Sequence, residues 1–180
     1  PGTYSLTAYS TEELVARNYI LNDHPDVVVD VVDASNIERN LYLATQLIEM
    51  NAPLVLAFNM GDIAKQKGLL FDTEKLSTLM EAKIVQTVAS KKVGKDDLLQ
   101  AIIDTTRQKK KDRAHKIHYG REIETHLDDL KKHIKNKHPE LLEKYEPSWI
   151  SIKLLEGDTD IIQKINDQQL LQKREKAIQH

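Results

Sequence analysis

The sequence Val-Val-Val-Asp-Val-Val occupies residues 27–32, and turn-forming residues flank it at 25–26 and 33–36. Short β-branched runs bounded by turn residues are typical of strands. Two similar apolar runs follow at residues 54–58 and 84–88. Nearly continuous apolar runs indicate strands that are buried on both faces of a sheet. The first part of the chain is therefore expected to contain three buried strands, each followed by a polar loop.

Helical patterns fill the gaps between these strands, at about residues 38–50, after Asp72 or Thr73, and from Asp96 onward. Alternating strands and helices predict an α/β fold with a parallel sheet and right-handed crossovers. Beyond a basic run at residues 109–113 the pattern is helical only, with apolar stripes at 123–134 and 149–155 and a candidate helix cap at Asp158. We expect an α/β domain at residues 1–112 and a small all-α domain at 113–180.

The composition of the chain limits the classes of function that are possible. The 180 residues carry a formal net charge of −2, which gives no indication of a nucleic-acid partner. There are no cysteines, so disulfides, thiolate zinc sites and thiol catalysis are excluded for this sequence. No apolar run reaches the roughly 20 residues that a bilayer requires, and the segment is expected to be soluble.

The loop after the second strand contains Asn59, Met60, Gly61 and Asp62. Ligands of open parallel sheets bind beyond the carboxyl ends of the strands. A carboxylate at Asp62 could accept hydrogen bonds from the ring N–H and the exocyclic amine of guanine, a donor pair that adenine lacks. The Asn-x-x-Asp spacing matches the guanine-reading motif of GTPases, although lysine is commoner at the position of Met60. The alternative is a simple Asx turn that closes a strand.

The loop after the third strand strengthens the guanine hypothesis. Val88, Ala89 and Ser90, followed by Gly94, are similar to the last guanine-binding loop of small GTPases. In that loop a backbone N–H at the position of Ala89 meets the guanine carbonyl oxygen. The start of the chain adds Gly2 and Thr3, which match the end of an Asp-x-Pro-Gly sequence whose glycine contacts the γ-phosphate. Residues 4–11 would then form the second switch, whereas an isolated Pro-Gly turn is the plain alternative.

Taken together, these motifs resemble the ferrous iron transport protein B family. The resemblance covers residues 1–10, which are similar to the second switch of that family, and residues 31–43, its most recognisable signature. The family also favours methionine after the asparagine of the guanine motif, as at Met60. Residues 147–158 resemble the helical domain that follows the GTPase domain in that family.

The resemblance implies a P-loop GTPase-like sheet that is incomplete because the phosphate loop is absent from this sequence. It implies GTP hydrolysis in the intact protein, coupled to ferrous iron uptake, with GTP or GDP and Mg²⁺ as cofactors and K⁺ as a further candidate. The Mg²⁺ ligands are expected upstream of Pro1, so no catalytic residue is assigned, and the chain alone is expected to be inactive. The implied partner is a transmembrane portion of the same polypeptide at the cytoplasmic face of the cell membrane, the inner membrane in bacteria. Homo-oligomerisation is left open.

Three alternatives stay open. The chain could be a regulatory or interaction module without nucleotide, since the phosphate cradle is missing. It could bind metal through His115, His118, His133 and His138, but these lie in a lysine-rich stretch with no acidic residue at matching spacing, so solvated histidines and no metal site are expected. A flavodoxin-like or receiver-like domain would make Asp33 a phosphoacceptor. The resemblance instead gives Asp33 the task of organising the turn after its strand.

Overall fold

The computed structural model describes residues 3–6, 10–107 and 117–178. These residues divide into two compact units. One unit holds β1–β3 with α2–α5 and the short helices η1 and η2, and the other holds α1 with η4 and α6–α9. The domain boundary expected at residues 112–113 lies outside the described residues.

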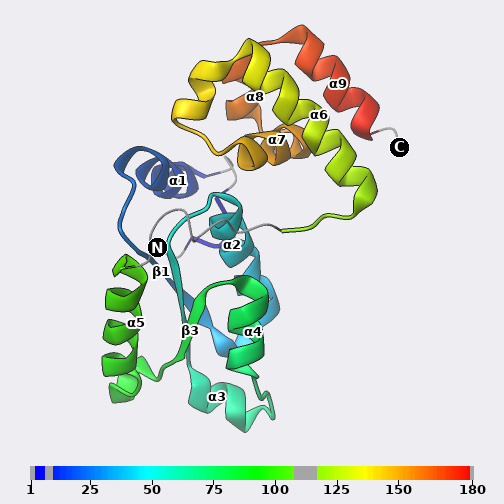
Figure 1. The fold of residues 1–180 in the computed structure, drawn as a ribbon. Helices are drawn as coiled ribbons and strands as arrows, with labels where there is room; N and C mark the ends of the chain where they lie inside the picture. The colour runs from blue at the N-terminus through cyan, green and yellow to red at the C-terminus, as the bar shows by residue number, and fades with distance from the viewer. Residues whose placement is uncertain (1–2, 7–9, 108–116, 179–180) are drawn as a thin grey trace. The chain divides into compact units, whose positions relative to one another are not determined.

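The first unit is a parallel sheet of order β1-β2-β3, formed by Val28–Asp33, Leu54–Asn59 and Lys83–Gln86. Each of the three predicted strands is present, and both pairings are parallel. The helices between the strands are α2 (Ile37–Glu49), α3 (Gly61–Gln66) and α4 (Thr73–Met80), with η1 at Ala34–Asn36; η2 (Ala89–Lys91) and α5 (Lys95–Arg107) follow β3. Figure 1 shows α5 on one side of the strands and α2 and α4 on the other. The predicted α/β class is confirmed.

Burial differs between the strands. β2 is buried along its length, from Leu54 to Phe58, as a central strand should be. β1 alternates instead: Asp30 and Val32 are buried, whereas Val31 is 62% exposed. The expectation that every strand is buried on both faces is therefore wrong for β1, and also for β3, in which no residue is fully buried. For β1 the physical reason is its position, since β1 lies at the edge of the sheet and only one of its faces is covered.

The second unit is all-helical, as expected. It contains α6 (Arg121–Lys137), η4 (Pro139–Glu143), α7 (Pro147–Glu156), α8 (Thr159–Ile165) and α9 (Gln168–Ile178). Its core is formed by large apolar side chains that are almost fully buried: Leu127, Leu130, Ile134, Trp149, Ile150, Leu154, Ile161 and Leu170. Gly157 ends α7 in a left-handed conformation, and the Asp158 side chain caps α8, as the sequence predicted. Among the helices that the structure describes, none has both the length and the apolar character of a membrane span.

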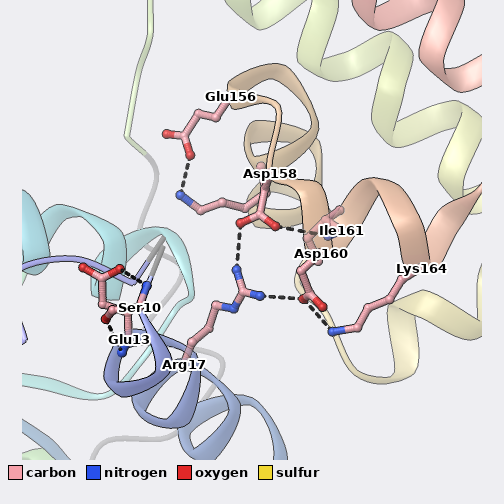
Figure 2. A network of polar contacts seen from close by, with 9 residues as sticks. Ser10, Glu13, Arg17, Glu156, Asp158, Asp160, Ile161 and Lys164 are labelled. Carbon is pink, nitrogen blue, oxygen red and sulfur yellow. Dashed lines mark hydrogen bonds and ion pairs between the residues drawn. The ribbon is translucent and has the colours of Figure 1, made fainter. Parts of the chain in front are cut away.

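A helix that the sequence analysis did not predict, α1 (Thr11–Asp23), belongs to this second unit. It begins with a capping box in which Ser10 and Glu13 exchange backbone-to-side-chain hydrogen bonds of 3.2 and 3.3 Å. Figure 2 shows how Arg17 fixes this helix: its guanidinium donates to Asp158 at 2.7 Å and to Asp160 at 2.5 Å. Arg17 is only 1% exposed, so α1 is anchored by a buried ion pair.

Candidate guanine-binding site

The two predicted guanine loops lie side by side at one edge of the sheet. β2 and β3 are adjacent and parallel, with Phe58 paired to Gln86, so their carboxyl ends coincide. The ladder continues one step past β3, where the Thr87 N–H donates to the Phe58 carbonyl at 2.8 Å. The sequence analysis depended on these loops converging, and the structure brings them together.

Asn59 links the two loops directly. Its Oδ1 accepts a hydrogen bond from the backbone N–H of Ala89 at 3.0 Å and lies 3.4 Å from the hydroxyl of Thr87. Asn59 therefore braces the loop that follows β3. Because Asn59 takes up the Ala89 N–H, the use of that N–H as a donor to guanine stays a prediction.

Asp62 lies in the first turn of α3, just beyond the left-handed residue Met60. The Gly61 N–H donates to the Thr87 carbonyl at 3.3 Å, which holds the start of α3 against the neighbouring loop. The Asp62 carboxylate accepts from the Ile63 N–H at 3.0 Å and from the Lys91 ammonium at 2.5 Å. The hydrogen bond from Lys91 holds the pKa of Asp62 below its usual range, with the Ile63 N–H acting in the same direction. Asp62 is therefore an ionised acceptor at neutral pH.

Lys91 is a member of the site that the sequence analysis did not single out. It lies in η2 and reaches across to Asp62 from the neighbouring loop, with its side chain 62% exposed. An exposed lysine can move away from the carboxylate without a packing cost. The only sign of this contact in the sequence was a lysine in a loop that was expected to lie opposite the loop of Asp62.

The loop after β3 has a defined shape. Val88 and Val93 form an antiparallel bridge, which closes residues 88–93 into a tight hairpin-like turn. Ala89 and Ser90 lie at the exposed tip of this turn, in η2. The structure thus gathers Asn59, Met60, Asp62, Val88, Ala89 and Ser90 on adjacent loops of one edge.

The structure describes only one of the two residues that were predicted to contact the γ-phosphate. Gly2 lies outside the described residues, whereas Thr3 is half-buried. Next to it, the ring of Tyr4 stacks on the guanidinium of Arg39 in α2, with 4.0 Å between the guanidinium carbon and the ring centroid. Thr3 shares no contact with Asn59 or Asp62 that the structure describes. Asp33 organises the turn after β1, as expected, by accepting from the Ser35 N–H at 2.8 Å.

Comparison with known proteins identifies relatives of both units. Residues 1–102 match the model of the family described as ferrous iron transport protein B, and residues 119–180 match that of the FeoB cytosolic helical domain. A fusion protein of Porphyromonas gingivalis, an Fe(2+) transport protein A/Fe(2+) transporter FeoB, is 39% identical over 170 residues. The Fe(2+) transporter FeoB of Escherichia coli is 35% identical over 162 residues. The chain covers only 20% of the length of each of these relatives.

Solved structures agree with the sequence matches. The mGMPPNP-bound NFeoB of S. thermophilus superposes with a TM-score of 0.81 and 33% identity, over 99% of this chain and 66% of that chain. The FeoB G-domain of Methanococcus jannaschii is 48% identical, with a TM-score of 0.58 over 60% of this chain and 69% of that one.

The fold is therefore a G-domain-type parallel sheet followed by a helical domain. The chain belongs to the ferrous iron transport protein B family.

Proposed function

We propose that this chain supplies the base-reading part of a GTP-binding and GTP-hydrolysing domain that is coupled to ferrous iron uptake. The observation that supports the proposal most strongly is the bracing of Ala89 by Asn59 at 3.0 Å, beside the ionised Asp62. In the proposed nucleotide complex, Asp62 accepts from the two guanine donors in place of Lys91, and the guanine oxygen accepts from the N–H of Ser90 or, in place of Asn59, from that of Ala89. Relatives whose structures hold mGDP or mGMPPNP share the fold at 32–33% identity.

The phosphate chemistry is assigned to groups outside this sequence. The 180 residues contain no Gly-x-x-x-x-Gly-Lys-Ser/Thr loop, the element that cradles phosphates in such domains. No ligand of Mg²⁺ or K⁺ and no catalytic residue is assigned here. Gly2 and Thr3 would sense the γ-phosphate, and hydrolysis would proceed by in-line attack of water, accelerated by positioning and charge neutralisation.

The edge of the sheet supports a larger domain. Within the part of the chain that the structure describes, β1 pairs with β2 alone, and its Val31 is 62% exposed. Exposed edge strands with apolar side chains are ready to pair with another strand. We assign this edge to the remaining strands of the GTPase domain, and the all-α domain at residues 113–180 to the cytoplasmic face of the membrane beside the transmembrane portion.

The test is a titration with fluorescent GDP, on the 180-residue chain and on the intact transporter in detergent. The intact protein should bind at micromolar concentration or tighter, and Asn59→Ala should weaken that binding about tenfold because the two loops lose their brace. Asn136→Ala, at an exposed position on α6, is the matched control and should leave binding unchanged.

The same titration distinguishes the nucleotide-binding proposal from the competing function. A regulatory or interaction module without nucleotide would show no saturable GDP binding in the intact transporter. The 180-residue chain by itself should bind GDP much more weakly than the intact protein, because phosphate contacts dominate nucleotide affinity. Equal affinities for the two forms would contradict the assignment of the phosphate site to groups outside this sequence.

A further inference from the structure

Two histidines and an aspartate converge within the helical unit. His133 lies on α6, His138 follows the end of that helix, and Asp167 immediately precedes α9. The Nε2 atoms of His133 and His138 lie 2.8 and 2.9 Å from the same carboxylate oxygen, Asp167 Oδ2. Figure 1 shows α6 running beside α9, the packing that brings these residues together. The expectation that these histidines are solvated at the surface is therefore wrong for His133 and His138, whose acidic partner comes from a distant part of the sequence.

These groups are partly shielded from water. The side chains of His133, His138 and Asp167 are 8%, 20% and 17% exposed. By contrast His118, which the sequence analysis considered with them, is 81% exposed, and His115 lies outside the described residues. The cluster is thus sheltered and still reachable by a small ion.

Asp167 is held in a fixed orientation. Its second oxygen, Oδ1, accepts the N–H groups of Gln169 and Leu170 at 2.8 and 3.3 Å, which caps the start of α9. These capping bonds leave Oδ2 directed at the two imidazoles, so the carboxylate is already oriented as a metal ligand would be.

We infer that His133, His138 and Asp167 form a binding site for a divalent first-row transition-metal ion such as Zn²⁺. The three ligand atoms all lie within 4.8 Å of one another. Metal–ligand distances of about 2.0–2.1 Å in tetrahedral geometry place neighbouring ligand atoms about 3.3 Å apart, so the two N–O separations need to open by only a few tenths of an ångström. Two imidazoles and one carboxylate are a donor set that suits such ions and leaves a position for water.

A further carboxylate lies where it can orient one of the ligands. Glu140 Oε1 is 3.4 Å from His138 Nδ1, on the side of the ring away from Asp167. A carboxylate that accepts from Nδ1–H leaves the Nε2 lone pair available to the metal.

The test is equilibrium dialysis of the 180-residue chain against Zn²⁺ in a weakly chelating buffer, with Co²⁺ absorption as a spectroscopic check of coordination. The wild-type chain should bind one equivalent, and Zn²⁺ should raise its melting temperature. His133→Ala and His138→Ala should each weaken binding at least about tenfold. His126→Ala, which removes another histidine of α6 outside the cluster, should bind as the wild type does.

The Asp167→Asn variant tests whether a loss of binding is due to misfolding, because asparagine also caps helices and should preserve α9. It should keep the circular dichroism spectrum and still lose at least about tenfold in Zn²⁺ affinity, since a neutral amide is a poor ligand. The inference would be overturned if the wild type bound no Zn²⁺. It would equally be overturned if the three cluster variants bound as tightly as His126→Ala.

Discussion

At the scale of single residues, Gly94 is a glycine whose backbone constrains the loop after β3. Its φ is +78°, and a Cβ there would lie 2.3 Å from the carbonyl oxygen of Gln86. Gly68 has nearly the same backbone, with φ at +76°, but a Cβ there would meet nothing within 4 Å. The two glycines therefore separate the cost of a left-handed backbone from the cost of a steric clash.

We predict that Gly68→Ala lowers the free energy of unfolding of the sheet unit by about 1 kcal/mol, the cost of a left-handed alanine. Gly94→Ala should cost about 3 kcal/mol or more, because the backbone of β3 must also shift. Urea unfolding followed by hydrogen exchange in β2 and β3 measures both. Equal losses at the two positions would show that Gln86 does not confine the loop.

Asp30 is a buried acid in the edge strand. Burial raises the pKa of Asp30 from its ordinary value of 3.8 to about 6, and its Oδ2 has no hydrogen-bond partner among the described residues. The protonated form is thus favoured in the folded state, so stability should be greatest below pH 4 and fall as the pH rises from 4 to 6. A shift of about two units corresponds to roughly 3 kcal/mol above pH 6.

Asp30→Asn should therefore raise the unfolding free energy by about 2 kcal/mol at pH 7.5 and change it little at pH 4. Urea titrations of the 180-residue chain at both values provide the measurement. Asp26→Asn, at an exposed position in the loop before β1, is the control and should have no such pH-dependent effect. An equal gain at both pH values would refute burial of the charge as the cause.

At the scale of elements, α1 is attached to the helical unit by the ion pair of its buried residue Arg17. Arg17 pairs with Asp158, which is 4% exposed and also caps α8 through the Ile161 N–H at 3.1 Å. The guanidinium carbon of Arg17 lies 5.9 Å from the centroid of the Trp149 ring. Removing one partner of a buried ion pair leaves the other charge uncompensated, which commonly costs about 3–5 kcal/mol.

Arg17→Met should lower the unfolding free energy of the helical unit by about 3 kcal/mol. The fluorescence of Trp149 reports this unit selectively, because it is the only tryptophan in the sequence. The double variant with Asp158→Asn should recover part of the loss, since no unpaired charge remains there. Arg121→Met, at the exposed start of α6, should leave the unfolding free energy unchanged. A similar loss in that variant would show that the ion pair does not explain the effect of Arg17→Met.

The sequence predicted the elements of the sheet well because its strands are short, β-branched runs whose ends must meet at one edge. The same pattern predicted that the loop of Asp62 and the loop of Ala89 would lie at the same edge of the sheet, as they do. It missed α1, whose apolar residues form no single stripe, although the capping box at Ser10 and Glu13 was a usable signal. It could not predict the pairing of His133 with Asp167, because helix packing joins residues that are 34 positions apart.

At the scale of the whole molecule, the chain joins two units with different chemistry. The α/β unit carries an ionised carboxylate and a braced backbone loop at the carboxyl edge of its sheet. The helical unit carries a sheltered pair of imidazoles around one carboxylate. Membership in the ferrous iron transport protein B family accounts for the order of the two units. The nucleotide hypothesis depends on the first of these sites alone.

The most direct test of that hypothesis is the base preference of the Asp62→Asn variant in the intact transporter. Asparagine cannot accept from both guanine donors, but its amide can donate to the additional oxygen of xanthine. We predict that the ratio of GTP to XTP affinity falls at least about a hundredfold, or about 2.8 kcal/mol, while Asp96→Asn leaves it unchanged. A variant that still discriminates between GTP and XTP as the wild type does would contradict the assignment of Asp62 as the guanine-reading residue.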